Sequence, residues 1–186
     1  MLHPTVFDTS QAWPGVFATP HLQASPLADG DAALFAMLYG DPDTMHHVGP
    51  VLDREAAWRG FSAARAQMRA QPPRARYWRL DADGGAVGLL SLVVDPVPDC
   101  AETGVLLAGD GRGRGFAAEA LSGLLSQVLR ESGLCAVWTR HRPGHAAAVG
   151  LMRGLRFEAE GMHGPWSRWR MTRARWRALV GERGGD

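Results

Sequence analysis

The chain has 186 residues, of which 46% are hydrophobic and 21% are charged, and its formal net charge is +1. These values are typical of a globular protein, and the length favours one domain. We expect a single domain over residues 1–186, with residues 1–15 forming a loose N-terminal arm. A dedicated nucleic-acid-binding protein carries a clear basic excess, which this chain lacks, so we expect no nucleic-acid partner.

The sequence contains no lysine, no asparagine and no isoleucine, while Ala, Gly, Pro and Arg are abundant. This bias is typical of a GC-rich bacterial genome. The missing lysine excludes three classes of enzyme. Schiff-base chemistry needs a lysine amine. A Walker A loop and a protein kinase each need a lysine to hold the nucleotide phosphates.

Cys100 and Cys135 are far apart in the sequence and form no CxxC motif, so we expect two free, buried thiols in a reducing compartment. The N-terminus lacks the basic and apolar regions of a signal peptide. No apolar run reaches the ~18 residues that cross a bilayer. The sequence therefore predicts a cytoplasmic protein with no membrane partner, either a monomer or a homodimer.

The first third of the chain predicts one strand and two helices. Val16–Leu22 is the candidate strand. Aspartate side chains accept hydrogen bonds from the free amides of a first helical turn. They suit the starts of both helices, Asp29 or Asp31 before Ala32–Leu38 and Asp53 before Arg54–Ala70.

The remaining elements predict a mixed α+β domain. Turn sequences separate three strands of an antiparallel meander, Arg76–Leu80, Ala86–Val94 and Cys100–Leu107. A helix that ends near Arg130 follows. The last elements are a strand at Cys135–Arg140, a helix at His145–Gly154, a hairpin of Arg156–Ala159 with Trp166–Met171, and a helix capped by Thr172. Within the hairpin, Trp169 and Met171 should face the core and the neighbouring arginines the solvent.

The segment Gly109–Gly115 stands between a predicted strand and a predicted helix. Glycine allows close backbone approach and positive φ, and the start of a helix carries partial positive charge. The segment is thus suited to hold a pyrophosphate, with Arg112 and Arg114 as further donors. A purely structural glycine turn fits the spacing as well. A Rossmann fingerprint does not, because GxGxxG is absent and a meander precedes the loop.

The string A-E-T-G-V-L-L-A-G-D-G-R-G-R-G-F-A-A-E-A, Ala101–Ala120, resembles the acetyl-CoA-binding segment of the GNAT acetyltransferases, in particular their RimJ/RimL branch. That branch reads A-E-[I/L]-G-Y-x-[I/L]-x-P-x-x-x-G-x-G-[Y/F]-A-T-E-A, and the two align without a gap. Thr19–Leu22 resembles the opening of the branch, and Leu151–Phe157 resembles its closing LLxxxGF segment.

The resemblance implies the GNAT fold, a mostly antiparallel sheet of about seven strands flanked by helices. The fourth and fifth strands, here Cys100–Leu107 and Cys135–Arg140, would splay apart with acetyl-CoA between them. The implied activity is acetyl transfer from acetyl-CoA, as co-substrate, to a primary amine. The amine would belong to a protein N-terminus or to a small molecule.

The same resemblance assigns the binding of acetyl-CoA to three parts of the chain. The backbone of one strand would pair with the pantetheine arm and polarise the thioester, at Val105, Leu106 and Leu107. The amides of the glycine segment would hold the pyrophosphate, at Arg112, Gly113, Arg114, Gly115, Phe116 and Ala117. His145 takes the place of an asparagine that contacts CoA in the family.

Glu102 is the candidate catalytic base that accepts a proton from the acceptor amine, whereas Glu119 suits a structural role at a helix start. Ala148 replaces a serine that is the family's proposed general acid, and His141 or His145 are the alternatives. This loss also motivates a second hypothesis, a non-catalytic acyl-CoA-binding module.

Two further features of the sequence do not indicate a metal site or a nucleophile. His46-His47 lacks the supporting residues of a metal site and instead falls where the family lines its acceptor site. Cys135 is interpreted as a buried apolar residue rather than a nucleophile.

Overall fold

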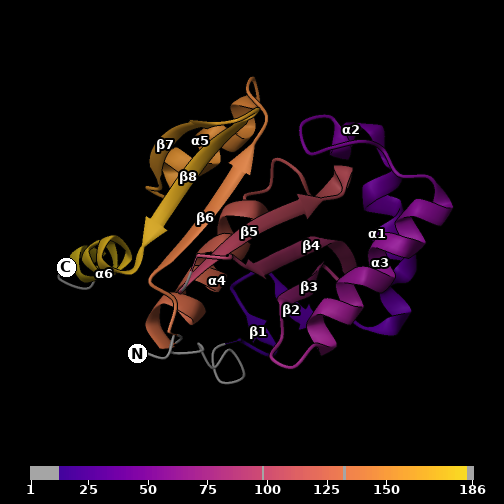
Figure 1. Cartoon of the computed structure of the whole chain (residues 1–186), viewed down its shortest axis with the longest axis horizontal. Coiled ribbons are helices and arrows are strands. Elements are labelled where there is room, and N and C mark those ends of the chain that lie inside the picture. The colour runs from indigo at the N-terminus through magenta and orange to yellow at the C-terminus, as the bar shows by residue number, and fades with distance from the viewer. Residues whose placement is uncertain (1–12, 98, 132, 184–186) are drawn as a thin grey trace, which may run out of the picture.

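The computed structural model describes residues 13–97, 99–131 and 133–183, so the predicted arm over residues 1–15 lies almost entirely outside the described residues. A central sheet has helices on both faces (Figure 1). Its strands are β1 Phe17–Ala18, β2 Gln23–Pro26, β3 Ala75–Ala82, β4 Gly85–Val94, β5 Cys100–Leu107, β6 Ala136–His141, β7 Glu158–His163 and β8 Trp166–Thr172. The helices are α1 Ala32–Gly40, α2 Pro42–Met45, α3 Arg54–Arg69, α4 Phe116–Glu131, α5 Ala146–Gly154 and α6 Arg173–Arg183.

The described strands form an eight-stranded sheet in the order β1-β2-β3-β4-β5-β6-β8-β7. All neighbouring pairs are antiparallel except β5 and β6, which run parallel. Parallel neighbours need a crossover connection, which α4 supplies. The structure confirms the mixed α/β, mostly antiparallel architecture and adds one strand to the expected seven.

The extra strand corrects the prediction of a single strand at Val16–Leu22. The chain reverses inside that segment, where the Thr19 amide donates to the Leu22 carbonyl at 2.9 Å. β1 therefore ends at Ala18 and pairs back on β2. The local apolar pattern did not reveal this reversal because it spans only four residues.

The pairing of β5 with β6 lasts for three residues only. The partners are Cys100 with Ala136, Ala101 with Val137, and Glu102 with Trp138. Beyond Glu102, β5 continues to Leu107 beside β4 alone, while β6 stays paired with β8 as far as His141. Figure 1 shows β6, β8 and β7 turning away from β5. The predicted splay of these two strands is confirmed.

Each face of the sheet buries its own group of apolar side chains. α4 packs on one face, and its predicted apolar stripe is buried there, at Leu121, Leu124, Leu125, Val128 and Leu129. α1 and α3 cover the other face with a smaller cluster that includes Phe35, Leu38 and Phe61. Removal of this apolar surface from water provides most of the drive to fold. In the described part of the chain, no helix combines the length and the apolar character needed to cross a bilayer.

Aspartates shape the helix starts in three ways. Asp53 caps α3 as predicted, because its Oδ1 accepts the Ala56 amide at 2.7 Å. Asp31 makes no side-chain bond to α1. It accepts the Ala28 amide at 2.7 Å and pairs with Arg79 at 3.2 Å. Asp41 begins the unexpected one-turn helix α2, where Pro42 occupies the first position that proline tolerates.

The cysteine prediction is half correct, since Cys100 is buried and Cys135 is exposed. Cys135 precedes β6 at the end of the sheet, where its amide donates to the Asp99 carbonyl at 2.7 Å. The interpretation of Cys135 as a buried apolar residue is therefore wrong.

In the terminal hairpin, Trp169 and Met171 are buried as expected.

Gly88 allows β4 and β5 to approach closely. A Cβ at Gly88 would lie 2.2 Å from the Leu106 carbonyl oxygen. We expect Gly88→Ala to lower the free energy of unfolding by about 2 kcal/mol, because the backbone must shift to relieve the overlap. Urea denaturation followed by tryptophan fluorescence measures this change. Gly85→Ala is the control, since no atom lies within 4 Å of its Cβ position, and equal stability of the two variants would contradict the prediction.

Candidate active site

The splay leaves one edge of β5 without a partner strand from Thr103 to Leu107. Backbone N–H and C=O groups on such an edge need a partner and readily pair with an extended ligand. Val105, Leu106 and Leu107, predicted to pair with pantetheine, all lie on this edge. The edge therefore supplies the backbone donors and acceptors on which that prediction depends.

The turn that follows β5 carries the predicted anion cradle. Gly113 and Gly115 have φ of 72° and 81°, a region that glycine enters without the steric cost of a side chain. A Cβ at either position would meet no atom within 4 Å, so the space beside both is open. The first backbone bond of α4 joins the Glu119 amide to the Gly115 carbonyl at 3.0 Å. The Arg112 amide donates to the Gly109 carbonyl at 3.3 Å, whereas the amides from Gly113 to Ala118 make no backbone bond within the described residues. These amides can bind an anion at the positive end of the helix.

The two arginines of this turn have protein partners of their own. Arg112 Nε donates to the Leu107 carbonyl at 3.2 Å, and its terminal nitrogen contacts Asp41 Oδ2 at 3.3 Å and Thr44 Oγ1. Arg114 pairs with Asp83 at 2.6 Å and lies over the Phe116 ring. The cradle is consequently built mainly from backbone amides rather than from these two side chains.

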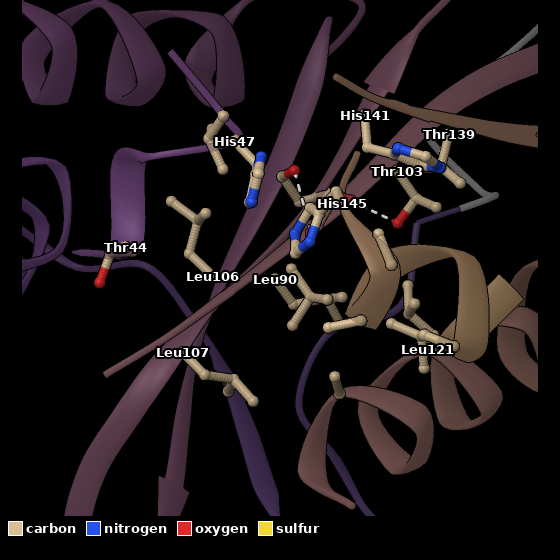
Figure 2. A pocket seen from close by; sticks show the side chains of 18 of the residues that line it. Thr44, His47, Leu90, Thr103, Leu106, Leu107, Leu121, Thr139, His141 and His145 are labelled. Carbon is tan, nitrogen blue, oxygen red and sulfur yellow. Dashed lines mark hydrogen bonds between the residues drawn. The ribbon is translucent and has the colours of Figure 1, made fainter. Parts of the chain in front are cut away.

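A cavity of about 950 Å³ runs from this turn along β5 to β6 and α5 (Figure 2). All the predicted cofactor-binding residues line it except Arg114, and Glu102 lines it as well. Other lining residues come from the opposite side of the sheet, and of these only His47 was predicted. They include Tyr39, Asp43, Thr44, His47, Val48, Tyr77, Ser91 and Val93. The cavity therefore extends from the glycine turn to a second region on the other side of the sheet.

Glu102 occupies the last residue of β5 that pairs with β6. Its Oε1 lies 3.0 Å from Arg140 Nε, and 29% of its side chain is exposed. Burial raises the pKa of Glu102, and the Arg140 guanidinium opposes that rise. The carboxylate is thus a stronger base than an exposed glutamate and stands at the point where the two strands separate.

Histidines from two elements meet above the cavity. The ring of His47 stacks on the ring of His145 with centroids 4.4 Å apart, and Figure 2 shows both beside the cavity. Burial, with smaller contributions from His47, His141 and His46, lowers the pKa of His145. Neutral imidazole is thus favoured there.

Within the described residues, no three His, Cys, Asp or Glu side chains form a group suited to a metal ion.

His141 has no nitrogen free for proton transfer. Its Nε2 accepts the Trp169 indole N–H at 2.9 Å, and an indole can only donate. Nδ1 therefore carries the proton and donates to the Arg142 carbonyl at 2.8 Å. Of the two histidines considered as general acid, His141 is committed to structure and His145 is held in its neutral form.

Tyr77, Ser91 and Tyr39 are among the cavity-lining residues that sequence reasoning missed. Tyr77 pairs with Ser91 in the sheet, and Ser91 pairs with Gly104, so the three form a row on the face that carries Glu102. Burial, and then the Glu102 charge, raises the pKa of Tyr77. In the sequence, the alternation of side chains between the two faces of β3 and β4 was the only indication of these residues. The register between the strands is needed to show that they lie on the same face as Glu102.

Glu119 joins two distant parts of the fold, as its predicted structural role requires. Its carboxylate accepts hydrogen bonds from the hydroxyl of Thr19 and, at 2.7 Å, from the backbone amide of His21. On the same helix, a Cβ at Gly123 would lie 2.8 Å from Thr19 Cγ2. α4 is thereby tied to the β1–β2 turn, which steadies the helix whose N-terminus faces the cavity.

Comparison with known proteins assigns the family. The profile described as "Acetyltransferase (GNAT) domain" matches residues 21–158, which is well over half of the chain. The chain therefore belongs to the GNAT acetyltransferase family.

Solved structures of the same fold include several acetyltransferases. A ribosomal L7/L12 alpha-N-protein acetyltransferase (RimL) in complex with coenzyme A matches with a TM-score of 0.73 and 14% identity, over 84% of this chain and 97% of that one. A spermidine N-acetyltransferase from Vibrio cholerae, in complex with CoA and spermine, gives 0.71 and 18% over 84% and 98%. The microcin C7 self-immunity acetyltransferase MccE, in complex with acetyl-CoA and AMP, gives 0.73 and 11% over 88% and 99%.

The residues present suit acetyl-CoA as the acetyl donor. The open glycine turn at the start of α4 suits a pyrophosphate, and the unpartnered edge of β5 suits the amide groups of a pantetheine arm. The protein is thus an acetyl-CoA-dependent N-acetyltransferase.

The backbone cradle can be tested at Gly115. We expect Gly115→Val to weaken acetyl-CoA binding by at least roughly tenfold, because a β-branched residue resists positive φ and fills the open space beside the turn. Isothermal titration calorimetry measures the affinity. Gly161→Val is the matched control, since Gly161 has φ of 83°, equally open space, and a place in β7 outside the cavity lining. Unchanged affinity in Gly115→Val would refute the cradle.

The imidazole of His145 offers a second test. We expect its pKa to lie below the ordinary value of about 6.5, because burial and the neighbouring histidines disfavour the cation. Two-dimensional NMR of the ring protons over a pH series gives this value, with the signal assigned by comparison with His145→Gln. A pKa above about 6.5 would show that the His145 ring is more solvated than the structure indicates.

Proposed function

We propose that Glu102 is the base for direct acetyl transfer to a primary amine in a ternary complex. The observation that carries this proposal is the position of the Glu102 carboxylate, at the point where β5 and β6 separate and on the wall of the cavity. A partly buried carboxylate of raised pKa suits a general base. It stands between the donor and acceptor regions.

The reaction forms one bond and breaks one. The neutral amine attacks the thioester carbonyl carbon, the new C–N bond forms, and the C–S bond breaks. Glu102 accepts the proton that the nitrogen loses, directly or through a water molecule. An amide on the free edge near Val105–Leu107 donates to the carbonyl oxygen as negative charge develops there.

The departing sulfur needs little help. A thiol has a pKa near 8.5, so its thiolate is a tolerable leaving group at neutral pH. The loss of the family serine at Ala148 and the commitment of His141 to Trp169 and Arg142 are compatible with this chemistry. We propose that the thiolate takes its proton from solvent.

The acceptor is a protein N-terminus or a small-molecule amine. The similar structures span both classes, one described as a ribosomal-protein acetyltransferase and another as a complex with spermine. The free thiols of Cys100 and Cys135 support action in a reducing, cytoplasmic compartment. Composition supports a bacterial source.

Substitution of Glu102 tests the mechanism. We expect Glu102→Gln to lower kcat by roughly 10²- to 10⁴-fold while acetyl-CoA affinity stays within about twofold, since general-base catalysis supplies a factor of this size. Thiol release from acetyl-CoA measures turnover. Glu158→Gln, an exposed carboxylate paired with Arg175, is the control. Wild-type turnover in the Glu102 variant would remove this residue from the chemistry.

If the wild-type protein binds acetyl-CoA but transfers its acetyl group to no amine, the result would favour a non-catalytic acyl-CoA-binding module.

The pH profile distinguishes a base from a positioning residue. Attack needs both the neutral amine and ionised Glu102, so log kcat/KM should rise with pH with a slope of about two at acid pH and about one between the two pKa values. Burial raises the pKa of Glu102 above 4.5, which moves the steeper region upward. Glu102→Gln should show a slope of about one throughout, and a persistent slope of two in that variant would assign the base elsewhere.

A further inference from the structure

The guanidinium of Arg140 forms part of the acceptor wall beside the catalytic carboxylate. Its Nε lies 3.0 Å from Glu102 Oε1, and 45% of its side chain is exposed. Both residues line the cavity. An acceptor amine that approaches Glu102 therefore approaches a fixed positive charge as well.

Aromatic rings hold Arg140 in this place. Its guanidinium carbon lies 5.1 Å from the centroid of the Trp166 ring and 5.7 Å from that of Trp138. Trp138 is itself fixed, because its indole N–H donates to Asp95 at 2.6 Å. Stacking leaves the edge of a guanidinium free to bind oxygen atoms. Arg140 is thus preorganised rather than freely mobile.

The hydrogen-bonding capacity of Arg140 exceeds what the described residues use. A guanidinium has five N–H donors. Its ion pair with Glu102 is made through Nε, and its terminal nitrogens donate to no other side chain or carbonyl in the part of the chain that the structure describes. Terminal N–H groups on the wall of a cavity are suited to a bidentate bond with a carboxylate.

Two further arginines lie near this wall, Arg168 and Arg170 on β8. The charge of Arg168 acts on Glu102, and that of Asp95 opposes it. Arg168 and Arg170 both pair with Glu160, so one carboxylate serves two guanidinium groups. A polycationic acceptor would bring further positive charge against these arginines, whereas an acceptor with its own negative group would not.

We propose that Arg140 determines acceptor specificity by binding a carboxylate two bonds from the reacting amine, so that the acceptor is a free α-amino acid. Glu102 then faces the amine, and Arg140 faces the carboxylate of the same molecule. The adjacent anion and cation of the protein match the adjacent cation and anion of such an acceptor. This inference rests on the proposed function of Glu102 as the base.

The test compares matched acceptors on the full-length enzyme with acetyl-CoA. The probes are the standard amino acids, their α-carboxamides, spermidine and a short peptide with a free N-terminus. We expect kcat/KM for the best amino acid to exceed that for its carboxamide by at least roughly tenfold, since an amide cannot form the charged pair. Higher kcat/KM for spermidine or for the peptide would overturn the proposal and assign the acceptor to that class.

Two arginine variants separate binding of the carboxylate from other roles. In Arg140→Gln, kcat/KM for the amino acid should fall roughly 10- to 100-fold, while that for the carboxamide changes by less than about threefold. Equal losses for both acceptors would mean that Arg140 acts only through Glu102 and would overturn the proposal. Arg142→Gln is the control, because Arg142 contacts the same Trp166 ring but does not line the cavity.

Folding and function are kept apart in this design. Thermal unfolding and acetyl-CoA affinity, measured for both variants, show whether each retains the native fold. If the wild-type enzyme binds acetyl-CoA but acetylates none of the probes, both the proposed function and this inference are overturned. If kcat/KM for the carboxamides, spermidine and the peptide equals that for the amino acids, only this inference is overturned.

Discussion

The brevity of the parallel pair between β5 and β6 is the constraint on which the site depends. Three residues of β5 pair with β6, and the rest of the strand keeps a free edge. Had the pairing continued, the backbone groups at Val105–Leu107 would bond to β6 and the cavity would close. Glu102 stands at the last paired position, so the geometry that opens the cleft also fixes the side chain proposed to act in it.

The two sides of the cavity come from different layers of the fold. α4 and α5 pack against one face of the sheet and supply the glycine turn and His145. The opposite face supplies Tyr77, Ser91 and Glu102, which share one side of the sheet through the registers of β3, β4 and β5. The cavity therefore extends through the gap in the sheet and is lined from both of its faces. Variation in α1 and β3 would change this opposite face and leave the glycine turn before α4 unaltered.

Local patterns predicted the features that depend on neighbours in sequence. The bounds of Cys100–Leu107 and the cap at Asp53 both follow from a few adjacent residues. The family resemblance added the splay, which no local pattern contains.

What the sequence did not predict depends on residues far apart in the chain. Arg112 bonds to Asp41 and Thr44, and Arg114 bonds to Asp83, so that neither arginine is free in the way its position in a glycine segment suggests. Tyr77 enters the site through strand register. Cys135 is exposed although Leu134 before it and Ala136 after it are buried. The local apolar pattern did not show that β6 begins only at Ala136.

The bond between Arg112 and the start of α2 has a consequence for the kinetics of the enzyme. Arg112 leaves the donor turn and reaches Asp41 and Thr44, close to the loop that carries His47 into the acceptor region. A donor bound at Gly113 and Gly115 would therefore be linked to the His47 side of the cavity through Arg112. Such a link would favour ordered addition of the substrates, with acetyl-CoA first and the amine second.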